Sequence, residues 1–112
     1  MAITKGGILG KSNPGATTDT VLYTVPSSKR AIAQINAANR SATEGRVRIA
    51  HALAGASVNW NTDALIYDGL ITRDSPINFT GIALATDEDI IVRADVATIA
   101  FTITRLEFDD GV

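Results

Sequence analysis

Residues 46–53 read Arg-Val-Arg-Ile-Ala-His-Ala-Leu, and this segment indicates the fold class most clearly. Its large apolar side chains stand at Val47, Ile49 and Leu53, and the arginines Arg46 and Arg48 alternate with them. Successive side chains of a β-strand point to opposite faces, so a period of two collects the apolar residues on one face. An amphipathic helix would need a period near 3.6. The stretch therefore predicts a strand with one buried face.

The same alternation recurs along the chain, with turn residues between the segments. The expected strands cover residues 20–25, 29–38, 46–53, 64–67, 77–80, 90–94 and 96–108, with another short piece at 70–73. Strands spaced about ten residues apart and separated by turns are typical of an antiparallel β-sandwich. We therefore expect an all-β fold, Ig-like or jelly-roll-like, with seven to eight strands. No segment has the pattern of a good helix.

The last expected strand changes phase near its end. Its apolar residues move from Phe101 and Ile103 to Leu106 and Phe108, which is a shift of one residue. A shift of one residue moves the apolar set to the other face of the sheet. The pattern therefore predicts a β-bulge or a strand end near residues 104–105.

The glycine-rich segment at residues 6–12, Gly-Gly-Ile-Leu-Gly-Lys-Ser, raises the question of nucleotide binding. A phosphate-binding loop needs four residues between its first glycine and Gly-Lys-Ser/Thr, and only three separate Gly6 from Gly10. The turn Asn13-Pro14-Gly15 then stops any helix. We interpret residues 1–19 as an extended N-terminal arm and residues 20–112 as the sandwich domain. Ile8 and Leu9 in this arm are candidate contacts with a partner subunit.

Composition limits the classes of function. The chain has 112 residues, a net charge of −2 and no cysteine, which predicts one domain without disulfides or thiolate metal sites. The charge gives no general reason to bind nucleic acid or an anionic membrane, and we expect neither partner. No apolar run approaches the ~20 residues of a membrane span, and the start lacks the apolar core of a signal peptide.

The candidate catalytic and metal-binding groups favour a protein that is not an enzyme. His51 is the only histidine and falls on the apolar face of its strand, where a buried or half-buried sheet histidine is expected. With no second histidine and no cysteine, it has no partners for a zinc site. The acidic residues 87–89 and 107–110 lack the spacing of a calcium site, and we interpret them as solvated. We expect no cofactor and no bound metal.

Two features remain as candidate interaction sites. Arg46 and Arg48 share one strand face and would pair with an acidic surface on a partner. Trp60 lies between two asparagines in a loop, which fits an interface residue and, as an alternative, a sugar contact. Large apolar residues also fall on faces that should be polar in a one-sided sandwich, namely Leu22, Ile32, Leu70 and Ile91. They indicate surface that other subunits cover.

The stretch LYTVPSSKRAIAQINAANRSATEGRVRIAHALAG, residues 22–55, resembles a family of small virion proteins of tailed bacteriophages. These proteins typically carry a Tyr-Thr-Val-Pro turn, a strand ending in Asn-Arg-Ser and a Val-Arg-Val strand. Further matches follow at residues 66–68, 81–84, 89–92 and at Phe101, so the resemblance covers about residues 16–108. Ser28 stands where the family usually has glycine, and the N-terminal segment is not part of the family pattern.

The resemblance implies a non-catalytic structural subunit of a phage particle, made in the host cytoplasm and located in the virion. We expect a capsid cement or decoration protein that binds the major capsid protein or other virion subunits, and that itself forms a dimer or trimer. The expected interface residues are Ile8, Leu9, Arg46, Arg48 and Trp60. A tail, baseplate or fibre-base component is the first alternative, and a glycan- or receptor-binding module that uses Trp60 is the second.

Overall fold

The computed structural model describes residues 3–53, 64–72 and 75–109, which form eight strands and no helix. The strands are β1 (Ile3–Ser12), β2 (Thr20–Thr24), β3 (Lys29–Asn39), β4 (Gly45–Leu53), β5 (Ala64–Ile71), β6 (Pro76–Leu84), β7 (Glu88–Ala94) and β8 (Ile99–Asp109). The all-β prediction is confirmed. In the described part of the chain, no helix is long and apolar enough to cross a membrane.

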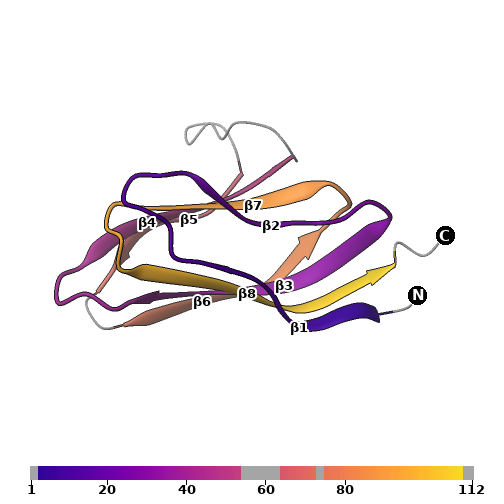
Figure 1. The fold of residues 1–112 in the computed structure, drawn as a ribbon, viewed down its shortest axis with the longest axis horizontal. Helices are drawn as coiled ribbons and strands as arrows, with labels where there is room; N and C mark the ends of the chain where they lie inside the picture. The colour runs from indigo at the N-terminus through magenta and orange to yellow at the C-terminus, as the bar shows by residue number, and fades with distance from the viewer. Residues whose placement is uncertain (1–2, 54–63, 73–74, 110–112) are drawn as a thin grey trace.

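The strands form two four-stranded antiparallel sheets that pack face to face (Figure 1). Sheet A has the order β1-β8-β3-β6, and sheet B has the order β2-β7-β4-β5. The first strand therefore pairs with the last, the second with the seventh, the third with the sixth and the fourth with the fifth. A long hairpin rolled up on itself gives this order, which is that of an eight-stranded jelly roll. The predicted antiparallel sandwich is confirmed, and the order selects the jelly roll over the Ig-like arrangement.

The N-terminal segment is the first strand of this jelly roll. The sequence analysis placed residues 1–19 outside the sandwich, whereas β1 pairs along β8 at the edge of sheet A. The alternation in β1 is hidden by a bulge, because Ile8 and Gly10 pair with the consecutive residues Thr104 and Ile103. Leu9 is the extra residue of this bulge, and it is buried in the core of the sandwich.

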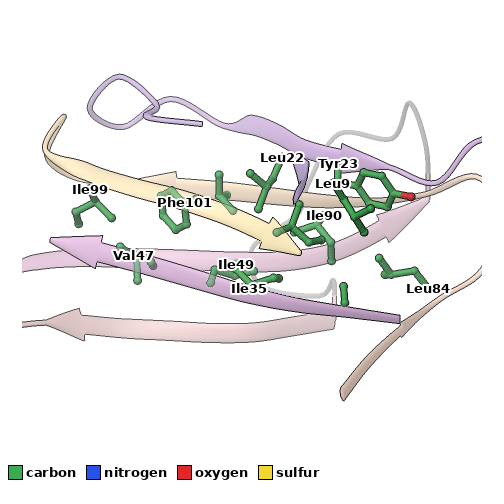
Figure 2. Close-up of a cluster of buried hydrophobic side chains, with 14 of the residues drawn as sticks. Leu9, Leu22, Tyr23, Ile35, Val47, Ile49, Leu84, Ile90, Ile99 and Phe101 are labelled. Carbon is green, nitrogen blue, oxygen red and sulfur yellow. The ribbon is translucent and has the colours of Figure 1, made fainter. Parts of the chain in front are cut away.

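The core lies between the two sheets and consists mainly of aliphatic side chains, with the aromatic rings of Tyr23 and Phe101 among them (Figure 2). The largest fully buried side chain is Phe101 in β8, and Ile35 of β3 and Ile49 of β4 are also fully buried. Most other inward positions of β3 are alanines, namely Ala31, Ala33 and Ala37, which allows the sheets to approach closely. Leu22 and Tyr23 are both buried because the β2–β7 register shifts between Val21 and Tyr23.

Two local expectations differ from the structure. The segments predicted as separate strands around residues 64–67 and 70–73 form the single strand β5, which continues through Asp68 and Gly69 opposite β4. In β8, Arg105 has a positive φ of 116°, yet the pairing with β3 has no register shift. The strand therefore does not change face: Leu106 stays exposed and Glu107 occupies a buried position.

A buried asparagine fixes the connection between β3 and β4. The Asn39 side-chain amide donates to the carbonyls of Thr43, at 2.9 Å, and Ile71, at 3.2 Å. Its carbonyl oxygen accepts the backbone N–H of Ser41 at 2.9 Å. These three bonds satisfy a buried polar group and tie the turn to β5.

Candidate interaction surfaces

Among the side chains that the structure describes, three large apolar ones are exposed on the outward face of sheet A, on adjacent strands. Ile8 of β1 is 57% exposed, Ile32 of β3 is 43% exposed and Leu106 of β8 is 39% exposed. Ile32 pairs directly with Leu106, and Leu106 pairs with Gly6 of β1, whose missing side chain leaves the leucine uncovered from that side. We call Ile8, Ile32 and Leu106 the apolar cluster.

The surface around the apolar cluster is poor in charge. The outward register positions farther along sheet A carry mainly uncharged side chains, namely Gln34, Asn36, Ala38, Pro76, Asn78, Ala83, Ala100, Thr102 and Thr104. The charged residues at described outward positions of this face are exposed and basic: Lys11 pairs with Thr102, and Arg30 pairs with Phe108. At one end, next to Ile32 and Phe108, lies a hollow of about 360 Å³ that Glu88 of the other sheet also lines.

The outward face of sheet B carries a different feature, a group of arginines. Arg46 and Arg48 lie at alternate positions of β4, as the sequence analysis expected, and Arg93 of β7 pairs directly with Arg48. Arg46 Nη2 lies 2.8 Å from Asp68 Oδ1, and Arg48 Nε lies 3.4 Å from the same oxygen. Arg93 Nη1 lies 3.3 Å from Asp19 Oδ1. We call Arg46, Arg48 and Arg93 the arginine cluster.

The structure separates the interface residues that the sequence analysis grouped together. Ile8 lies on the outward face of sheet A, and Arg46 and Arg48 lie on the outward face of sheet B, on opposite sides of the sandwich. Leu9 is 7% exposed and is buried in the protein's own core, so it is not an interface residue. Trp60 lies outside the described residues.

The four apolar residues that the sequence analysis placed on polar faces divide into two pairs. Ile32 and Leu70 are exposed, by 43% and 52%, and are available to a partner. Leu22 and Ile91 are buried within the chain, at 6% and 4% exposure. Leu106 was not singled out, because the apparent change of phase in the sequence of β8 assigned it to the wrong face.

His51 is a half-buried sheet residue, as expected from its place in the alternation. Its Nε2 lies 3.0 Å from Glu88 Oε1, and that oxygen also accepts the Ala85 N–H at 2.6 Å. Burial would raise the pKa of Glu88, but the hydrogen bond from Ala85 and the interaction with His51 together lower it below its ordinary value. Across the described ranges, no three acidic, histidine or cysteine side chains gather as a metal site.

The buried Glu107 is held by a tyrosine from the other sheet. The Tyr23 hydroxyl donates to Glu107 Oε2 at 2.5 Å, and this contact joins β2 to β8 across the sandwich. Burial, the hydrogen bond and the negative charge of Glu107 all favour the protonated phenol. They raise the pKa of Tyr23 well above its ordinary value.

This raised pKa predicts a pH dependence of stability. The folded state holds the Tyr23 proton more tightly than the unfolded state, so the resulting stability is complete below pH 10 and is lost as the pH rises above it. We expect the free energy of unfolding of the wild type to fall relative to Tyr23→Phe above pH 10, by at most about 1.4 kcal/mol per pH unit.

Urea unfolding of both proteins at pH values from 8 to 11 measures this difference. Tyr67→Phe is the matched control, because the Tyr67 hydroxyl donates to the Leu70 carbonyl instead of a carboxylate. A constant difference between wild type and Tyr23→Phe over this range would contradict the assigned contact.

Comparison of the chain with protein-family models, curated proteins and solved structures finds no match. We therefore base the function on the fold, the two surfaces and the resemblance in the sequence.

Proposed function

We propose that this protein is a non-enzymatic structural protein of a tailed-phage particle, and that it binds the assembled capsid as a cement or decoration protein. The observation that carries the proposal is the exposed apolar cluster on a charge-poor sheet face. Contiguous apolar surface of this kind is unfavourable in water and marks a site that a partner covers. The sequence resemblance to phage virion proteins supports the choice of partner. Viral capsid domains also use the jelly roll, which supports it by analogy of fold alone.

The mechanism is burial of the outward face of sheet A against the capsid shell. The apolar cluster supplies the favourable burial, and the basic residues Lys11 and Arg30 on the same face complement an acidic shell surface. A protein that binds only the assembled joints between shell subunits stabilises them by mass action. The arginine cluster lies on the opposite side of the sandwich, so one molecule can contact two subunits at once. We also propose that copies of the protein associate as dimers or trimers, which analytical ultracentrifugation measures.

Co-sedimentation of the purified protein with phage heads and tails separated on a gradient tests the location. Binding to mature heads and not to tails is the expected result. Binding to tails alone would overturn the capsid assignment in favour of a tail, baseplate or fibre-base component. Binding to neither would contradict a structural role in the virion.

The variant Ile32→Glu tests which surface makes the contact. A carboxylate in the apolar cluster would be buried without a partner, so we expect the affinity for heads to fall at least tenfold, or about 1.4 kcal/mol. Val21→Glu is the matched control, because Val21 is 51% exposed but lies in β2 of the other sheet. Thermal unfolding checks that both variants fold. Equal head binding by the two variants would show that the sheet A face is not the contact.

A further inference from the structure

We propose that the arginine cluster is a binding site for a carboxylate group of a partner protein. The site is formed by Arg46, Arg48 and Arg93 on the outward face of sheet B. The identity of the partner as a virion subunit rests on the proposed function, whereas the chemistry of the site depends on these side chains alone.

The first support is the placement of two like charges at directly paired positions. Arg48 of β4 and Arg93 of β7 are register partners in neighbouring strands, and their side chains share the outward face. Like charges directly opposite each other in a sheet are destabilising. Arg46 adds a third positive charge two residues along the same strand. An anion placed between the guanidinium groups would relieve this repulsion.

The second support is the geometry of the chain's own carboxylates beside the arginines. One oxygen of Asp68 serves both Arg46, at 2.8 Å, and Arg48, at the longer distance of 3.4 Å. Asp95, which borders the cluster, accepts the backbone N–H of Arg46 at 2.9 Å. The arginine side chains are between 34% and 49% exposed, so they are partly desolvated but still accessible to a ligand.

The third support is a hollow between these side chains. It measures about 170 Å³ and is lined by the three arginines with Thr17, Ala94 and Asp95. A water molecule occupies roughly 30 Å³, so the hollow has space for a carboxylate and a few waters. Guanidinium groups bind carboxylates through planar paired hydrogen bonds. The net charge of −2 argues against a nucleic-acid phosphate as the source of the anion.

Nuclear magnetic resonance of the arginine Nε–H groups in the full chain tests the site directly. The probe is a capped peptide of four glutamates, compared with the same peptide of four glutamines and with inorganic phosphate at equal ionic strength. We expect saturable shifts at Arg46, Arg48 and Arg93 with the glutamate peptide and none with the glutamine peptide. Arg48→Gln should weaken the binding at least tenfold. Arg40→Gln removes the same charge outside the cluster and should leave the binding unchanged.

Thermal unfolding at low salt separates a binding role from a purely structural one. Because Arg48→Gln removes both the repulsion with Arg93 and the contact with Asp68, we expect its unfolding temperature to stay close to that of the wild type. A marked fall, with no saturable shift by either anion, would overturn the proposal and make the cluster a set of structural ion pairs. Shifts by phosphate alone would overturn the carboxylate assignment. Carboxylate binding by a protein that sediments with neither heads nor tails would overturn only the virion location.

Discussion

Replacing Phe101 with alanine is expected to lower the free energy of unfolding by about 3–5 kcal/mol. Among the described residues, Phe101 is the largest fully buried side chain, and it projects from the first half of β8 into the space between the two sheets (Figure 2). Its loss leaves a cavity that rigid β-strands on both sides cannot close, so the cavity cost adds to the lost apolar burial. Since a domain of this size has a total stability of about 5–15 kcal/mol, the variant will lose a large part of it.

Urea unfolding followed by circular dichroism measures the Phe101→Ala effect. Phe79→Ala is the matched control, because Phe79 is half-buried in the edge strand β6 and has its ring centroid 5.1 Å from that of Tyr67. We expect the control to lose clearly less stability. If Phe101→Ala and Phe79→Ala lost equal stability, this would contradict the conclusion that Phe101 is a central residue of the core.

The second large effect is expected from Gly10→Ala, which tests the packing of β1 on the sandwich. A Cβ atom at Gly10 would overlap the Leu22 carbonyl oxygen and would lie 3.3 Å from a methyl group of Ile103. Because the closest contact is with backbone, β1 or β2 would have to move. Overpacking of this kind costs about 1–3 kcal/mol.

Gly6→Ala is the control for Gly10→Ala in the same strand. A Cβ atom at Gly6 would make only an ordinary contact, at 3.6 Å from Leu106 Cδ2. We expect this variant to unfold at nearly the wild-type urea concentration. If both variants were equally stable, β1 would not be packed against the sandwich, and residues 1–19 would behave as the separate arm that the sequence indicated.

Most of the fold could be predicted from the sequence because its strands have one buried face. The alternation in residues 46–53 predicts an all-β structure, and the spacing of the turns predicts the sandwich. The first strand was missed because glycines and the bulge at Leu9 interrupt its alternation. The end of β8 was misread because an acidic residue, Glu107, takes a buried position and uses Tyr23 as its partner. Because Tyr23 lies 84 residues away from Glu107, the sequence around Glu107 does not indicate this contact.

The candidate surfaces could be predicted only in part. The common face of Arg46 and Arg48 follows from their spacing in one strand, and the structure bears it out. Arg93 lies beside Arg48, and Ile32 lies beside Leu106, because of the register between strands that are far apart in the sequence. The spacing of residues within one segment does not show this register. For the same reason, the sequence did not show that Ile8 and the arginines lie on opposite sides of the molecule.

A cryo-electron microscopy reconstruction of phage heads saturated with the protein would show where on the head it binds and through which face. We expect a jelly roll at the joints between shell subunits, with Ile8, Ile32 and Leu106 against the shell. Protein density that leaves this face of sheet A in solvent would contradict the assigned contact. Heads without any added density would contradict the function itself.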